Sequence, residues 1–216
     1  MNGIHRIEGR AAALRFDNLD TDQIMPKQFL RGIDKSGLAA GVLYDLRARP
    51  DFVLNRPEHA GASILIAGAN FGCGSSREHA VWGLQQFGIQ AILAPSFAEI
   101  FFANAMNNRL LLVSLAPEDI TRLADDADSN PSASITIDLT AQTVHSDSIT
   151  TSFDLLPRHR RMLLEGLDSI GLSLTYRDQI ERFAHQHWQQ QPWLRDVALR
   201  TTQRIKAQRL TELLKP

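Results

Sequence analysis

The sequence predicts an α/β domain with a parallel sheet at its core, covering helices and a helical C-terminal tail. Three short apolar runs alternate with two segments of helical periodicity between residues 62 and 115. Strands and helices that alternate at this spacing are typical of parallel strands joined by crossover helices. The chain has 216 residues, of which 44% are hydrophobic, and can therefore build one sizeable core.

The expected elements can be placed in order up to residue 115. Residues 4–14 are short and mixed, and are expected to form an edge strand. Residues 17–30 are typical of a loop, and residues 31–60 of a long excursion with one short helix. The alternating part then consists of strand 62–67, helix 76–87, strand 89–94, helix 97–107 and strand 110–115.

The pattern changes after Pro117, where polar turns separate shorter elements. These are expected to be a helix at 118–126, strands at 135–139, 143–145 and 149–153, and a helix at 156–165. Residues 177–215 are helical in composition, with Pro192 as the interruption. We therefore expect a sheet domain over 1–175 and a helical C-terminal extension over 176–216.

Composition excludes several classes of function. The net charge of −1 gives no basic field for nucleic acid, and no apolar run approaches membrane-spanning length. The N-terminus lacks a signal sequence, so a cytoplasmic protein without nucleic-acid or membrane partners is expected. One cysteine excludes an internal disulfide and cannot hold a cubane iron–sulfur cluster, which needs three or four thiolates. His185 and His187 lie two residues apart and point to different helix faces, so no metal site is expected.

The most informative stretch is residues 68–80, GANFGCGSSREHA, between an expected strand and an expected helix. A glycine turn at a helix N-terminus presents free backbone N–H groups and favours negative charge. The hydroxyls of Ser75 and Ser76 and the guanidinium of Arg77 suit a small carboxylate ligand there. The alternatives are structural: Ser75 and Glu78 also fit a capping box, Gly72 and Gly74 fit a tight turn, and His79 fits a packed helical residue.

Residues 17–30, DNLDTDQIMPKQFL, form a second motif that is open to two interpretations. Its Asn and Asp residues alone fit an Asx-rich turn. With residues 68–80, 94–108 and 166–174, however, it resembles the small subunits of 3-isopropylmalate dehydratase, in the aconitase superfamily. The four blocks occur in order and span roughly residues 5–180.

This resemblance implies a swivelling β/β/α domain of the aconitase type over 1–175. It implies a hydro-lyase that interconverts 2- and 3-isopropylmalate by dehydration and rehydration in leucine biosynthesis. The cofactor, a [4Fe-4S] cluster, is then supplied by a large subunit in a heterodimer or higher assembly, and the substrate is a small hydroxy-dicarboxylate.

The resemblance also implies roles for single residues. Ser75 is expected to be the base that transfers the proton, and Ser76 and Arg77 to bind substrate. Arg31 is expected to bind a substrate carboxylate, although a solvent-facing arginine is an equal alternative. Residues expected to order the surroundings are Asp22, Lys27, Gly72, Gly74 and His79. No metal ligand is expected in this chain.

Residues 31–46 depart from the family pattern, because leucines such as Leu38 and Leu46 stand where Phe and Trp are usual. A change of pocket shape on this side leaves a citramalate/citraconate or dimethylmalate hydro-lyase as an alternative. A partnerless carboxylate-binding module is a second alternative. A nucleotide-binding enzyme is disfavoured because the glycine turn lacks a phosphate-binding lysine.

Overall fold

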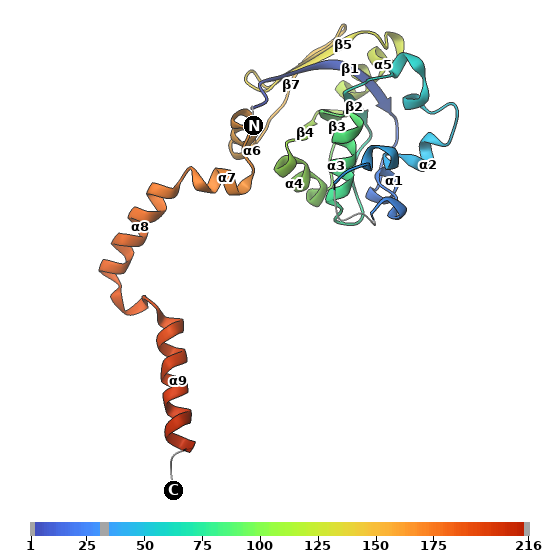
Figure 1. Ribbon diagram of the computed structural model, residues 1–216. Helices are drawn as coiled ribbons and strands as arrows, with labels where there is room; N and C mark the ends of the chain where they lie inside the picture. The colour runs from blue at the N-terminus through green and yellow to red at the C-terminus, as the bar shows by residue number, and fades with distance from the viewer. Residues whose placement is uncertain (1–2, 31–34, 214–216) are drawn as a thin grey trace. The chain divides into compact units, whose positions relative to one another are not determined.

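The computed structural model describes residues 3–30 and 35–213, with side chains up to residue 208. It divides into two compact units, residues 1–169 and 170–216. The first unit holds a seven-stranded sheet in the order β4-β3-β2-β1-β5-β6-β7 (Figure 1). The strands are β1 Arg6–Leu14, β2 Ile64–Ala67, β3 Ala91–Ala94, β4 Leu111–Ser114, β5 Ser134–Asp138, β6 Thr143–His145 and β7 Thr150–Ser152.

The parallel core predicted from the apolar runs is confirmed. The pairs β1–β2, β2–β3 and β3–β4 are parallel. The pairs β1–β5, β5–β6 and β6–β7 are antiparallel. Every residue of β2 and β3 is buried. Strands that are covered on both faces need continuous apolar runs rather than alternation, which explains the pattern of residues 62–67 and 89–94.

The expectation that residues 4–14 form an edge strand is wrong. The first half of β1, Arg6–Arg10, pairs with β5, and the second half, Ala11–Leu14, pairs with β2. This strand therefore joins the antiparallel and parallel parts of the sheet. Its partners lie about fifty and more than one hundred residues away in sequence, and local pattern carries no information about them.

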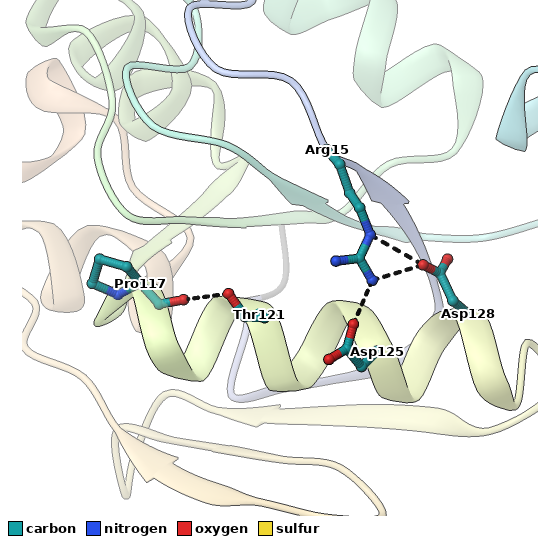
Figure 2. A network of polar contacts seen from close by, with 5 residues as sticks. All are labelled: Arg15, Pro117, Thr121, Asp125 and Asp128. Carbon is teal, nitrogen blue, oxygen red and sulfur yellow. Dashed lines mark hydrogen bonds and ion pairs between the residues drawn. The ribbon is translucent and has the colours of Figure 1, made fainter.

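The first unit also contains helices. They are α1 Thr21–Ile24, α2 Tyr44–Arg47, α3 Glu78–Phe87, α4 Glu99–Asn108, α5 Pro117–Ser129 and α6 Pro157–Glu165. Helices α3 and α4 pack side by side, and α5 lies against β1, β2 and β3. An arginine that follows β1 fastens α5: the Arg15 guanidinium donates to Asp125 at 2.7 Å and to Asp128 at 2.8 Å (Figure 2).

The second unit is helical, as its composition predicts. It contains α7 Ser169–Leu174, which begins at the boundary, α8 Arg177–Gln190 and α9 Val197–Leu213. Pro192 begins a short 3-10 helix between α8 and α9. His187 stacks on Phe183, and His185 contacts the Gln189 side chain, so each histidine packs within its own helix. Over the residues that are described, no helix is long and apolar enough to cross a bilayer.

Candidate active site

Three loops meet at the carboxyl edge of the parallel strands. The loops follow β1, β2 and β3, and backbone hydrogen bonds hold them together. Asn18 N–H donates to the Ala69 carbonyl at 2.8 Å, Gly72 N–H to the Leu19 carbonyl at 2.8 Å, and Phe71 N–H to the Ser96 carbonyl at 3.1 Å. The crevice outside the carboxyl ends of parallel strands is where open α/β sheets bind ligands. Both sequence motifs therefore converge at the edge of the sheet that is suited to a site.

The glycine turn needs its glycines for two different reasons. Gly72 and Gly74 have φ angles of 78° and 91°, a region that residues with a side chain rarely adopt. In addition, a Cβ on Gly72 would lie 2.2 Å from Cγ of Phe101, a buried residue of α4. The turn is therefore held in this conformation by its backbone and pressed against α4.

Gly72→Ala is expected to lower the free energy of unfolding by about 2–5 kcal/mol. The left-handed backbone costs about 1–2 kcal/mol, and overpacking against Phe101 adds about 1–3 kcal/mol. Gly37→Ala is the matched control, because Gly37 has a φ of 72° and no neighbouring heavy atom within 4 Å of the position that a Cβ would take. Urea unfolding of both variants measures the difference. Equal losses in the free energy of unfolding would show that overpacking against Phe101 contributes nothing.

Ser75 and Ser76 are both exposed on this turn. The capping-box interpretation of Ser75 is wrong, because α3 begins at Glu78 and its N-cap residue is Arg77. The expected helix start at residue 76 is therefore two residues early. A capping box does exist nearby: Asp20 caps α1 and accepts from Gln23 N–H at 2.7 Å, while the Gln23 side chain accepts from Asp20 N–H.

The turn also leaves backbone donors free. The N–H groups of Gly74, Ser75 and Ser76 find no hydrogen-bond partner among the described residues. Successive free N–H groups beside positive-φ glycines form a concave surface that attracts anions. Two exposed hydroxyls and three free N–H groups thus share one short segment.

Arg77 lies almost inside the protein, with 12% of its side chain exposed, and forms an ion pair with Asp22 of α1. The hydrogen bond from Arg77 holds the pKa of Asp22 below its ordinary value, against partial desolvation, and Lys27 acts in the same direction as Arg77. Asp22 itself is 48% exposed. The structure thus brings Asp22, Lys27 and Arg77 together, although their sequence positions are up to 55 residues apart.

The residues that follow Arg77 fasten α3 to α4. The Glu78 carboxylate accepts from the Asn108 side-chain amide at 2.6 Å, and Trp82 Nε1 donates to the same amide at 2.9 Å. His79 lies against the Trp82 ring, with 4.8 Å between centroids. This geometry favours the interpretation of His79 as a packed helical residue. Its contact with Trp82 helps to order α3, the helix that follows the turn.

Two further expectations concern the neighbourhood of the turn. Arg31 lies outside the described residues. Leu38, one of the leucines that depart from the family pattern, is 4% exposed and belongs to a 3-10 helix that packs against α3. Its side chain is part of the core. Within the described ranges, no group of three or more His, Cys, Asp or Glu side chains could hold a metal ion.

Thr21 is the residue that sequence reasoning overlooked. It is 1% exposed, and its hydroxyl donates to the Ser75 carbonyl at 2.9 Å. Its N–H donates to the Cys73 carbonyl at 2.8 Å. The sequence presents Thr21 only as one polar residue in an Asx-rich loop, and nothing in its spacing shows that the loop runs beside residues 70–75.

Comparison with known proteins agrees with this geometry. Residues 1–118 match the family model of the aconitase C-terminal domain, which is the class of protein that the sheet and its carboxyl-edge turn define. Residues 121–157 match a second model, described as LeuD_N.

Several relatives are similar over nearly their whole length. The 3-isopropylmalate dehydratase small subunit 1 of Chromobacterium violaceum is 62% identical over 206 residues, which covers 93% of this chain and 97% of the relative. The small subunit of Caulobacter vibrioides strain NA1000 is 47% identical, with coverage of 90% and 99%. A crystal structure of 3-isopropylmalate dehydratase from Methanocaldococcus jannaschii has a TM-score of 0.62 and 29% identity, covering 83% of this chain and 99% of that one. The chain therefore belongs to the family of 3-isopropylmalate dehydratase small subunits.

Proposed function

We propose that this chain acts with an iron–sulfur large subunit to interconvert 2- and 3-isopropylmalate by dehydration and rehydration. The observation that carries the proposal is the segment Ser75–Ser76–Arg77, where exposed hydroxyls and free N–H groups adjoin a guanidinium held by Asp22. Relatives of this chain that are named as small subunits of this enzyme support the choice of substrate.

Each residue of the segment has a chemical task in this reaction. Arg77 can hold two carboxylate oxygens at once, because its guanidinium is planar. Ser75 takes the proton from the carbon beside a carboxylate and returns it when water adds in the opposite sense. The free N–H groups stabilise the negative charge of the deprotonated hydroxyl, since oriented dipoles that point at an oxygen favour its anion.

The cofactor belongs to the partner in this proposal. A [4Fe-4S] cluster supplies the Lewis acid that assists the departure of the hydroxyl group. Such a cluster needs three or four thiolates, and this chain has a single cysteine. The cluster is therefore assigned to the large subunit, and this chain contributes the proton-transfer and carboxylate-binding groups.

Co-expression with the large subunit tests the proposal. We expect turnover of 2- and 3-isopropylmalate in an anaerobic assay only when both chains are present. The chain purified alone, after incubation with iron and sulfide, is expected to show neither cluster absorption nor turnover. A stoichiometric cluster in the isolated chain contradicts the two-subunit assignment, and turnover of citramalate or dimethylmalate in preference to isopropylmalate contradicts the substrate assignment.

A further inference from the structure

We propose that Thr21 is a positioning residue for Ser75 and Ser76, an inference that rests on the proposed function. Its hydroxyl fixes the orientation of the peptide group between the two serines, so that the Ser76 N–H stays available to the deprotonated Ser75 hydroxyl. The inference rests on one contact: Thr21 is buried, and its hydroxyl donates to the Ser75 carbonyl at 2.9 Å.

The direction of the Ser76 N–H follows from peptide geometry. A trans peptide is planar, so its N–H points opposite to its C=O. The Ser75 carbonyl points toward Thr21, which is 1% exposed and belongs to the protein interior. The Ser76 N–H consequently points away from the interior, on the side where both serine side chains are exposed. It has no hydrogen-bond partner in the described part of the chain and is available to an anion.

Nothing else in the described structure holds this peptide. Thr21 N–H fixes the Cys73 carbonyl, two residues before that of Ser75, at 2.8 Å, and Gly72 N–H fixes the turn to Leu19. The main-chain carbonyls of residues 74–77 lie between that bond and the start of α3. Apart from the bonds of the first turn of α3, the Thr21 hydroxyl makes the one hydrogen bond to these carbonyls among the described residues. Rotation about ψ of Ser75 and φ of Ser76, the two soft dihedrals that flank this peptide, can turn it over once that hydrogen bond is lost.

Thr21→Val tests the inference in the assembled enzyme, because valine retains the branched shape and loses the donor. We expect kcat to fall about three- to tenfold, the rate equivalent of one hydrogen bond, with KM for isopropylmalate changed less than about twofold. The pH at which kcat reaches half its maximum is expected to rise, because the Ser75 anion loses a donor. Thr21→Ser keeps the hydroxyl and is expected to restore both kcat and the pH profile.

A matched control exists on α5. The Thr121 hydroxyl donates to the Pro117 carbonyl at 2.9 Å, the same type of bond at the same length, in a residue that is not part of the glycine turn (Figure 2). Thr121→Val is expected to leave kcat and the pH profile unchanged. If Thr21→Val reduces only the yield or thermal stability, with kcat per assembled complex and the pH profile unchanged, Thr21 is structural and the inference is wrong. If the wild-type complex does not turn over isopropylmalate at all, the proposed function itself fails.

Discussion

Ser75→Ala is expected to lower kcat of the assembled enzyme by about 10²–10⁴-fold, the usual cost of losing a positioned proton-transfer group. Ser75 is exposed and makes no capping bond to α3, so alanine removes nothing that the helix needs. The amount of complex and the unfolding midpoint of this chain are therefore expected to stay near wild type. Steady-state kinetics and size-exclusion chromatography on the same preparation separate the two effects.

Ser114→Ala is the control for this prediction. Ser114 is exposed at the end of β4, an edge strand outside the glycine turn. Its replacement is expected to leave kcat unchanged. Near-normal turnover by Ser75→Ala would exclude Ser75 as the base. If total activity falls only as much as the amount of assembled complex falls, Ser75 contributes to the subunit interface instead.

Arg77→Lys is expected to lower kcat/KM by roughly ten- to a hundredfold while the fold stays intact. Lysine keeps the positive charge but cannot hold two carboxylate oxygens, and hydrogen bonds to charged groups contribute about 1.5–3 kcal/mol. The ion pair with Asp22 fixes the guanidinium before substrate binds, and a lysine ammonium loses the planar fork on which that arrangement depends. Kinetics over a range of isopropylmalate concentrations give the ratio.

A second arginine provides the comparison. Arg15 also pairs with carboxylates, those of Asp125 and Asp128 on α5, and 49% of its side chain is exposed (Figure 2). Arg15→Lys is expected to leave kcat/KM within about twofold, because exposed ion pairs contribute only about 0–1 kcal/mol. If Arg77→Lys behaves like Arg15→Lys, Arg77 does not bind the substrate carboxylate.

The alternating part of the fold is largely predictable from the sequence. Strands that are buried on both faces require apolar runs, and helices beside them require one apolar face, so the positions of β2, β3, β4, α3 and α4 are evident. The neighbours of β1 are not evident, because pairing with β5 depends on contacts more than one hundred residues apart. Helix starts shift for a similar reason: Ser75 resembles an N-cap locally, but Thr21 holds its carbonyl outside the helix.

The site is predictable only where its residues are contiguous. Ser75, Ser76 and Arg77 stand together in the sequence and lie together in the structure. The partners that orient them, Thr21 and Asp22, begin the short helix α1 in the loop after β1, more than fifty residues earlier. Resemblance to the family places that loop near the site, but only the structure shows which atom each side chain holds.

The division of β1 between the parallel and antiparallel parts of the sheet affects how the chain emerges during synthesis. Ala11–Leu14 can pair with β2 once about seventy residues are available, but Arg6–Arg10 has no partner until β5, at Ser134–Asp138, has been made. Throughout that interval the nascent chain exposes an unpaired strand edge, which can bind the same edge of another chain. A fragment that ends near residue 118 keeps the entire glycine turn and all four parallel strands, yet leaves this edge permanently open. Such a fragment is therefore expected to aggregate even though every residue of the proposed site is present.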